Sequence, residues 1–264
     1  MTGTDSHARD DHGSDGAAGP ANGGTDRGPA PDHDHAHSNG HEHHGHGHHD
    51  HGHHGHGHHH DRGWAGIVRY LRNAPRMWRS PVNDAVVALV APQRGEVVVD
   101  VGAGMGAGVV RAAAAGAHVI AVEPTPFMRR TLALRRLAQR GRKRIEIADG
   151  AAEDLPVDDR GADAIYAVNT MHHWVDVDRG IAEIARALAP SGRVLLVDEA
   201  FDDPEHPDHE RFASNGHAHP FTMVTAESMA ERLRSAGLVD VDPGLTHIAG
   251  RPVTAVTGRS RSNS

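Results

Sequence analysis

Short apolar runs alternate with longer amphipathic or alanine-rich segments through residues 95–258. The apolar runs at 97–101 and 118–122 have the length of β-strands, and the segment between them has the length of an α-helix. This alternation is typical of a doubly wound parallel sheet with helices on both faces. A helical pattern over 225–237 and two β-rich stretches within 238–258 complete the series. The pattern therefore predicts one α/β domain over residues 95–258.

Two helices are predicted ahead of this domain, within residues 63–94. The first covers residues 64–78 and is interrupted by a proline. The second begins with Ser80 as the N-cap and Pro81 in the first turn, and an apolar stripe follows. We expect these helices to cover a ligand pocket.

The turn after the first strand is rich in glycine, with Gly102, Gly104 and Gly106 at alternate positions. Because glycine has no β-carbon, the backbone can turn tightly there and a ligand can lie against bare peptide. The string also satisfies the relaxed dinucleotide fingerprint G-x-G-x-x-A. However, Asp100 precedes the first glycine by two residues, and a carboxylate at the mouth of the turn repels a pyrophosphate and attracts a cation. S-adenosylmethionine, which carries a sulfonium and an ammonium group, is such a ligand.

An acid, Glu123, closes the second strand about 20 residues after the glycines, where a carboxylate can accept hydrogen bonds from both ribose hydroxyls of an adenosine. Enzymes that bind NAD use the same device. Glu123 therefore indicates an adenosine cofactor, but it does not distinguish an enzyme that binds S-adenosylmethionine from one that binds NAD. The alternative is that Glu123 only caps the helix that begins near Pro126, where an acid is favourable.

The motif D-V-G-A-G-M-G, at residues 100–106, resembles the first motif of the class I S-adenosylmethionine-dependent methyltransferases. Segments 145–159, 162–174 and 183–199 follow in order and resemble the third, fourth and fifth strands of that fold. Together they are most similar to the methyltransferase type 11 branch, which is related to ubiquinone and menaquinone biosynthesis. The resemblance covers residues 79–258 and implies a seven-stranded Rossmann-like sheet with a reversed final strand.

The resemblance also implies that S-adenosyl-L-methionine is the cofactor and that residues at the strand ends bind it. The residues implied are Asp100, Gly102, Ala103, Gly104, Gly106, Glu123, Pro124, Ala152, Glu153 and Asn169. One position departs from the pattern, because Ala151 stands where relatives have the aspartate that binds the adenine amino group. The adenine must then be bound by the backbone near Ala152, or by Asp149 or Glu153.

Methyl transfer from a sulfonium is an in-line displacement on an activated donor, so the protein mainly has to align the acceptor and exclude water. Where the acceptor is a phenol, an alcohol or an acidic carbon, a base is useful, and His173 or His172 follows the fourth strand. The alternative is that one of these histidines packs and caps the helix near Asp176 while the other meets solvent. The string N-T-M-H-H-W argues against the amino-methylating DNA and glutamine methyltransferases, which have two prolines and an aromatic residue after the asparagine.

Acceptor choice is expected to depend on residues 201–221, which hold His206, His209, His217 and His219 among acids and phenylalanines. The spacing of these histidines could place several imidazoles around one metal ion. A polar lid is the favoured interpretation, since no helix is predicted that would fix their geometry.

The amino-acid composition and the net charge exclude several classes of function. The chain of 264 residues has no cysteine, which excludes disulfides, cysteine-ligated zinc and thiol catalysis and suits a reducing cytoplasm. No run of 18 apolar residues exists and the first 30 residues hold no apolar signal core, so membrane insertion and export are not expected. The formal charge is −8, of which −7 belongs to residues 1–62, so the near-neutral remainder gives no reason to expect nucleic acid as a partner.

Residues 1–62 form a polar arm, and 16 of the 28 residues from 33 to 60 are histidine. No hydrophobic core can form there, so we expect disorder, as we do for the tail at 259–264. Neutral imidazoles at this density are expected to bind Ni²⁺, Zn²⁺, Cu²⁺ or Co²⁺ by adaptable chelation. The expected ligands, taken collectively, are His43, His44, His46, His48, His49, His51, His53, His54, His56, His58, His59 and His60. In acid, protonation of its 18 histidines would take the charge of the arm from −7 toward +11, and the arm would then attract anionic surfaces.

Three hypotheses follow from these features. The favoured one is a cytoplasmic methyltransferase that uses S-adenosylmethionine for O-, C- or N-methylation of a quinone-like, phenolic or other small acceptor. The second is a metal-storing or metal-responsive protein that binds the cofactor without turning it over. The third is an NAD(P)-dependent oxidoreductase.

Overall fold

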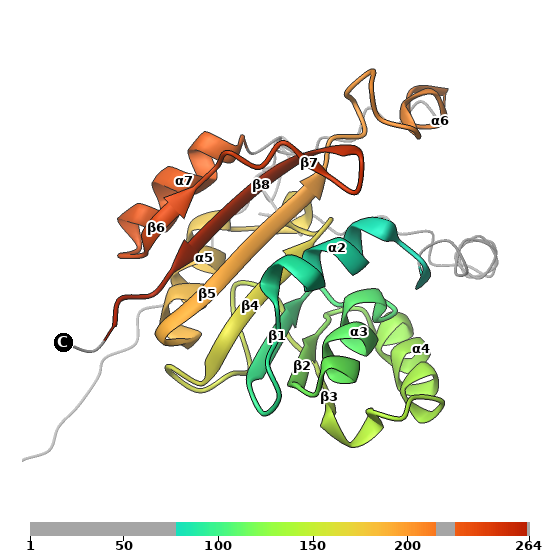
Figure 1. Cartoon of the computed structure of the whole chain (residues 1–264), viewed down its shortest axis with the longest axis vertical. Coiled ribbons are helices and arrows are strands. Elements are labelled where there is room, and N and C mark those ends of the chain that lie inside the picture. The colour runs from blue at the N-terminus through green and yellow to red at the C-terminus, as the bar shows by residue number, and fades with distance from the viewer. Residues whose placement is uncertain (1–77, 215–224, 263–264) are drawn as a thin grey trace, which may run out of the picture. The chain divides into compact units, whose positions relative to one another are not determined.

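The structure is a computed structural model that describes residues 78–214 and 225–262. Over these residues the chain forms a central β-sheet with helices on both faces, as Figure 1 shows. The predicted helix over 64–78 lies almost entirely outside the described residues, and so does the histidine-rich arm. His217 and His219 also lie outside them.

The sheet contains eight strands in the described part of the chain. They are β1 (Val97–Val101), β2 (His118–Val122), β3 (Ile145–Ala148), β4 (Ala162–Val168), β5 (Leu188–Glu199), β6 (Val239–Asp242), β7 (His247–Ile248) and β8 (Arg251–Arg259). The order across the sheet is β3-β2-β1-β4-β5-β8-β6, and β7 pairs with β8 off this path. Strands β1 to β5 run parallel, whereas β8 is antiparallel to both β5 and β6. The predicted α/β class with a reversed final strand is therefore confirmed, and the short β7 adds to the seven predicted strands.

Helices cover both faces of the sheet. They are α2 (Pro81–Val90), α3 (Ala107–Ala115), α4 (Pro126–Leu137), α5 (Val177–Ala187), α6 (His209–Ser214) and α7 (Ala226–Ser235), with the 3-10 turns η1 (Arg142–Arg144) and η2 (Met171–His173). One hydrophobic cluster joins α2, α3 and α4 to one face, and a second joins α5 and α7 to the other. Successive residues of β1 belong to opposite clusters, Val98 to the first and Val99 to the second, as expected for a strand buried on both faces.

The predicted start of α2 is confirmed, and local features also define the ends of two other helices. The Ser80 hydroxyl accepts a hydrogen bond from the N–H of Asn83 at 3.3 Å, and a proline opens α2. Gly116 ends α3 in the left-handed conformation, with φ of 103°. Thr225 caps α7 by accepting a hydrogen bond from the N–H of Ser228. Local side-chain chemistry therefore sets where these helices begin and end.

The segment after β5 differs from the prediction, because it contains the short helix α6 where we expected no helix. The first turn of α6 carries Glu210, and an acid there favours a helix start through the helix dipole. A helix this short, without a long apolar stripe, leaves little periodicity in the sequence. The hydrophobic pattern therefore did not reveal it.

The carboxyl ends of the parallel strands meet at one edge of the sheet. The strand order reverses between β1 and β4, and ligands of doubly wound sheets bind in the crevice at such a switch point. The glycine turn follows β1 here, and η2 follows β4. Within the described residues, no helix combines the length and the apolar character needed to cross a lipid bilayer.

Replacing Leu132 by alanine should lower the free energy of unfolding by about 2 to 5 kcal/mol, because this α4 side chain is fully buried against the glycine turn. The matched control is Leu134→Ala on the same helix, where the side chain is 71% exposed and the loss should stay within about 0.5 kcal/mol. Urea unfolding followed by circular dichroism measures both losses. Equal losses in the two variants would contradict the packing of α4.

Candidate functional site

The glycine turn between β1 and α3 is shaped by two close contacts. Gly102 has φ of 72°, and a Cβ there would lie 2.2 Å from Oγ1 of Thr170 in the loop after β4. Gly106 has φ of 78°, and a Cβ there would lie 2.2 Å from Cδ1 of Leu132. Residues with a side chain rarely adopt these angles, and the space for a side chain is already filled. Both positions therefore require glycine for the turn to close against its neighbours.

Backbone hydrogen bonds fasten the turn to β2. The N–H groups of Gly102 and Ala103 both donate to the carbonyl of Val122, at 2.8 and 3.0 Å. The N–H of Gly106 donates to the carbonyl of Ala103 at 2.8 Å. The fold itself thus holds the turn in position, without a contribution from a ligand.

The first turn of α3 has backbone donors without a capping side chain. Its N-cap residue is Gly106, and the first turn carries no acidic residue. The exposed N–H groups and the dipole at the start of a helix favour an anion such as a carboxylate. This end of the turn therefore suits the carboxylate of the methionine part of S-adenosylmethionine.

Glu123 lies at the end of β2, next to the glycine turn, and is 6% exposed. Its Oε2 accepts a hydrogen bond from the N–H of Gly104 at 2.8 Å, and its Oε1 accepts one from the N–H of Thr125 at 2.8 Å. Since each carboxylate oxygen has two lone pairs, both can also accept a ribose hydroxyl. Thr125 is the N-cap residue of α4 and follows Pro124, so Glu123 supports the start of that helix as well. The two predicted roles of Glu123 are therefore compatible.

Asp100 lies beneath the turn and not at its open mouth, where we predicted it. It is 4% exposed, and its Oδ2 accepts a hydrogen bond from the hydroxyl of the buried Tyr166 at 2.8 Å. Side chains alternate along β1, so Asp100 faces α3, where Gly108 leaves room for the pair. Burial raises the pKa of Asp100 to about 7; the Tyr166 hydrogen bond opposes this shift, and the charge of Glu123 adds to it.

Two of the three predicted adenine contacts have other partners. Asp149 forms a bidentate ion pair with Arg129 of α4, at 2.7 and 2.8 Å. Oε1 of Glu153 accepts two backbone N–H groups of the loop after η2, at 2.6 and 3.1 Å. These pairings leave lone pairs on both carboxylates, so the adenine contact stays a prediction that includes Asp149, Glu153 and the backbone near the buried Ala152.

Asn169, which we predicted to line the cofactor pocket, joins β4 to β5. Its Nδ2 donates to Oε1 of Glu199 at 2.7 Å, and its Oδ1 accepts the N–H of Glu199 at 2.6 Å. The residue has φ of 55°, a left-handed conformation that asparagine tolerates better than most residues do. Asn169 therefore turns the chain out of the sheet and into η2.

Asp198, which the sequence analysis missed, holds the loop that carries the two predicted catalytic histidines. Its Oδ1 accepts the N–H of Thr170 at 2.9 Å, and its Oδ2 accepts the N–H of His172 at 3.2 Å. The same Oδ2 lies 3.0 Å from Nδ1 of the His172 ring. The ring of His173 lies beside it, with the two centroids 4.1 Å apart. The cap of α5 is Asp176 itself and not a histidine.

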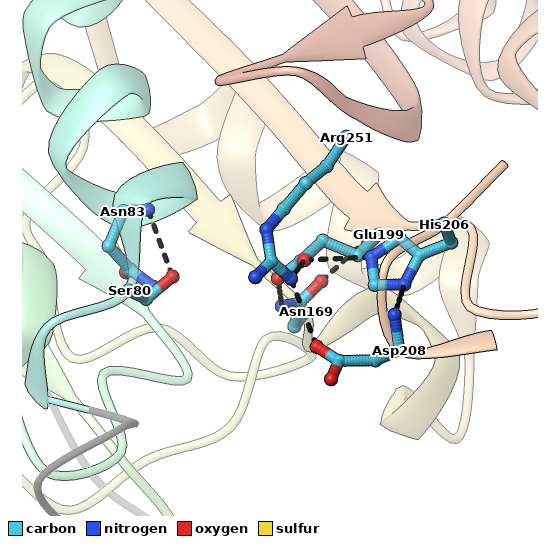
Figure 2. Close-up of polar contacts among 7 residues, drawn as sticks. All are labelled: Ser80, Asn83, Asn169, Glu199, His206, Asp208 and Arg251. Atoms are coloured by element: carbon cyan, nitrogen blue, oxygen red, sulfur yellow. Dashed lines mark hydrogen bonds and ion pairs between the residues drawn. The ribbon is translucent and has the colours of Figure 1, made fainter. Parts of the chain in front are cut away.

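Glu199 is the centre of a second polar cluster, drawn in Figure 2. Its Oε2 accepts a hydrogen bond from Arg251 at 2.8 Å and lies 3.1 Å from Nε2 of His206. Nδ1 of His206 accepts the N–H of Asp208 at 3.1 Å, so Nε2 is the nitrogen that donates to Glu199. Arg251 also donates to Asp208 at 3.2 Å. The cluster fastens the segment after β5 to the start of β8 (Figure 2).

The structure does not gather the described histidines of this segment into a metal site. Glu199 and Asp208 engage both ring nitrogens of His206, and His209 begins α6. Among residues 78–214 and 225–262, no three histidine or acidic side chains are arranged to hold a metal ion. Because His217 and His219 lie outside these residues, the polar lid stays a prediction.

Comparison with known proteins identifies the domain. A family model described as a methyltransferase domain matches residues 99–196, which run from within β1 to within β5. Residues 99–196 therefore match a methyltransferase domain, within a fold that SAM-dependent methyltransferases share. The recognised family and the observed strand order therefore agree.

Curated relatives of the methyltransferase domain include named enzymes. A demethylmenaquinone methyltransferase of Clavibacter sepedonicus is 35% identical over 132 residues, which are 50% of each chain. An O-methyltransferase of Penicillium expansum is 29% identical over 157 residues, which are 58% of this chain and 55% of that one. The chain thus spans about half the length of these curated relatives.

Solved structures share the fold of the methyltransferase domain. A SAM-dependent methyltransferase from Aquifex aeolicus aligns with a TM-score of 0.55 and 18% identity, over 73% of this chain and 96% of that one. The cyclase SpnF aligns with a TM-score of 0.54 and 19% identity, over 68% and 82% of the two chains. These likenesses show the fold alone, since one fold supports several chemistries.

Replacing Asp100 by asparagine should remove a pH-dependent loss of stability from the methyltransferase domain. The folded protein holds the Asp100 proton more tightly than the unfolded chain, so its stability falls as the pH rises from 3.8, the ordinary pKa, to about 7. A difference of one in pKa corresponds to about 1.4 kcal/mol, so the advantage of Asp100→Asn should grow by about 2 kcal/mol between pH 5 and pH 7.

Urea unfolding of the wild type and Asp100→Asn at pH 5, 6, 7 and 8 measures this difference. The matched control is Asp178→Asn on α5, where the carboxylate is 73% exposed and the difference from the wild type should not grow with pH in this way. A stability difference between Asp100→Asn and the wild type that is independent of pH would contradict the burial of an ionisable group beneath the turn.

Proposed function

We propose that this protein is an S-adenosyl-L-methionine-dependent methyltransferase that acts on a small-molecule acceptor. The observation that carries the proposal is the hydrogen bonding of the Glu123 carboxylate to the glycine turn and to the start of α4. The N–H groups of Gly104 and Thr125 hold this buried carboxylate in one orientation, and its remaining lone pairs suit two ribose hydroxyls. The matched family and the names of the relatives support the same activity.

The residues around the turn fit the parts of the cofactor. The start of α3 suits a carboxylate, and a Cβ on Gly104 would meet no atom closer than 4.0 Å, so a ligand has room against the backbone there. When bound, the cofactor supplies a methyl group on a positively charged sulfur, and this sulfur leaves as a neutral thioether. The proposed contacts are Gly102, Ala103, Gly104, Gly106, Glu123, Pro124 and Ala152, supported by Asp100, Glu153 and Asn169.

The acceptor class that we propose is a quinone-like or phenolic compound. One relative is named for demethylmenaquinone and another for O-methylation. In this chain, the segment after β5 is anchored at the carboxyl edge of the sheet by Glu199 and Arg251, next to the loop after β4. A fixed polar wall beside the switch point suits the alignment of a small acceptor.

An NAD(P)-dependent oxidoreductase is the alternative that the glycine turn alone would allow, because Glu123 and the start of α3 also suit a dinucleotide. Two observations favour methyl transfer. The family model that matches is a methyltransferase domain, and β8 is reversed next to β5. In its ionised form, the carboxylate of Asp100 beneath the turn also disfavours a pyrophosphate.

Replacing Glu123 by glutamine should weaken binding of S-adenosylhomocysteine by about 10-fold to 100-fold, because a charged acceptor for two ribose hydroxyls is lost. Titration calorimetry with this ligand and with its 2′-deoxy analogue separates a contact with the ribose from a general effect on the turn. The loss should be smaller for the deoxy analogue, since it lacks one of the two hydroxyls.

The matched control is Glu146→Gln on β3, where the side chain is exposed and the affinity should stay at the wild-type value. An equal loss for both ligands in Glu123→Gln would contradict the ribose contact. Wild-type protein that binds NADH and not S-adenosylhomocysteine would overturn the proposed function.

We also propose that the arm at residues 1–62, which lies outside the described residues, chelates divalent metal ions. The 16 histidines among its residues 33–60 offer many imidazoles without a rigid site, so affinity should follow the intrinsic order of the metals, with Cu²⁺ the tightest. If the domain bound the cofactor without turning it over, the arm would make the protein a metal-storing or metal-responsive one. A turnover assay with and without Ni²⁺ distinguishes these two functions.

Deleting residues 1–60 should abolish the binding of several Ni²⁺ ions per chain and leave the affinity for S-adenosylhomocysteine unchanged. The reason is that the proposed metal ligands lie in the arm and the proposed cofactor contacts lie in the described domain. Calorimetric titration of both proteins with NiCl₂ and then with S-adenosylhomocysteine measures the two effects. Undiminished Ni²⁺ binding after the deletion would refute the role of the arm.

A further inference from the structure

Asp198, near the end of β5, interacts with three nitrogen atoms of one loop. Its two oxygens accept the N–H groups of Thr170 and His172, at 2.9 and 3.2 Å, and Oδ2 lies 3.0 Å from Nδ1 of the His172 ring. The side chains of Asp198 and His172 are 18% and 20% exposed. An acid and an imidazole are thus held in one arrangement at the carboxyl edge of the sheet.

The contact with Asp198 defines which nitrogen of His172 is basic. An ionised carboxylate only accepts hydrogen bonds, so Nδ1 carries the proton that it donates to Asp198. In the neutral ring the lone pair then lies on Nε2, on the side away from the acid. The acid of a Ser-His-Asp triad acts in the same way, because it fixes the tautomer and stabilises the imidazolium that forms.

The loop that carries His172 packs against the glycine turn through Thr170. Thr170, two residues earlier, packs so closely against Gly102 that a Cβ there would lie 2.2 Å from Oγ1 of the threonine. One carboxylate, that of Asp198, accepts the backbone N–H groups of both Thr170 and His172. A single acid therefore fixes the imidazole relative to the proposed cofactor site.

We propose that His172 is the general base of the methyl transfer and that Asp198 is the residue that positions it. This inference rests on the proposed function, and it selects one histidine of the predicted pair and one class of acceptor. A base is useful when the acceptor holds its proton until the transfer, as a phenol or a quinol does. A neutral amine attacks through a lone pair that it already has. Such a base serves a hydroxyl compound of the phenol or quinol type, which is the acceptor class proposed above.

The proposed step balances in atoms and charge. The acceptor hydroxyl gives its proton to Nε2 of His172 while its oxygen bonds to the methyl carbon, and the sulfur keeps both electrons of the carbon–sulfur bond that breaks. The imidazolium of His172 then lies beside the carboxylate of Asp198, which compensates its charge. The ring finally releases the proton to water, so the products are a methyl ether, a neutral thioether and a proton.

Among the contacts of His172 are charged or titratable groups from two elements of the described structure, β5 and η2. Asp198 of β5 contacts the ring, and the ring of His173 lies with its centroid 4.1 Å away. The next acid along β5, Glu199, is engaged instead by the cluster drawn in Figure 2. Asp198 is thus the acid that compensates an imidazolium at His172.

The tautomer of His172 in the full-length protein tests this pair without any turnover. Long-range ¹H–¹⁵N correlation spectra of protein labelled with ¹⁵N-histidine, recorded with EDTA at pH 8, show which ring nitrogen carries the proton. The signal of His172 is assigned by its loss in His172→Gln. We expect the Nδ1–H form in the wild type and in the surface control Asp178→Ala, and a shift toward the Nε2–H form in Asp198→Ala.

A turnover assay then tests the role of the His172 ring as the base. The variant His172→Gln removes the ring but keeps both backbone hydrogen bonds from the loop to Asp198, so the support of the loop is unchanged. The probes are 1,4-naphthohydroquinone and 1-naphthylamine, which present a hydroxyl and an amine on the same ring system. In His172→Gln, methylation of the hydroquinone should fall about 100-fold or more. Its pH profile should also lose the acidic limb, on which the rate falls as the base becomes protonated. The matched control is His118→Gln, at the amino end of β2, which should keep both the rate and the profile.

The outcomes separate the inference from the function on which it rests. Failure of the wild type to bind S-adenosylhomocysteine in calorimetry overturns the proposed function. Binding with His172 in the Nε2–H form, or hydroquinone methylation by His172→Gln at the wild-type rate, overturns the base. Asp198→Ala with the wild-type tautomer leaves Asp198 as a support of the loop and overturns its positioning role. Wild-type protein that methylates the naphthylamine and not the hydroquinone, or neither of them, overturns the acceptor class.

Discussion

The geometry of the site depends on one close contact, that between the bare Cα of Gly102 and the side chain of Thr170. Because no Cβ separates them, the turn after β1 and the loop after β4 pack directly against each other at the switch point of the sheet. The turn carries the proposed cofactor contacts, and the loop carries His172. A larger residue at position 102 would push these two parts of the site apart, and a displacement of about 1 Å is enough to slow a transfer that requires alignment.

Several acids gather at this carboxyl edge, and their partners decide how each of them behaves. Glu123 and Asp198 accept backbone N–H groups, and Glu199 pairs with a guanidinium. Asp100 accepts from the neutral hydroxyl of Tyr166, and burial therefore dominates and raises its pKa to about 7. A cation bound above the turn would favour the ionised form of Asp100. Binding of a sulfonium compound and loss of this proton are therefore coupled.

The sequence predicted those features that depend on neighbouring residues, and it missed those that depend on distant ones. The strand at 118–122 has the predicted bounds, and α2 begins at its predicted cap, because periodicity and capping are local. The place of Asp100 depends on a partner 66 residues away, and that of Asp198 on one 26 residues away. Strand β7 and helix α6 are too short to show a periodic pattern of hydrophobic residues. The turn between β7 and β8 contains one glycine, which is a weak signal for a hairpin.

The reversed strand β8 explains how two consecutive acids at the end of β5 reach different partners. The pairing of β5 with β4 ends at Val197, whereas its pairing with β8 continues through Asp198 and Glu199. These two residues therefore stay in an extended strand, where successive side chains point to opposite sides. Asp198 meets the loop with His172, and Glu199 meets Arg251, which β8 itself supplies. A slip of one residue in this register would turn Asp198 and Glu199 to the opposite sides of the strand. The pairing of β5 with β8 therefore positions both the acid beside the proposed base and the acid that anchors the segment after β5.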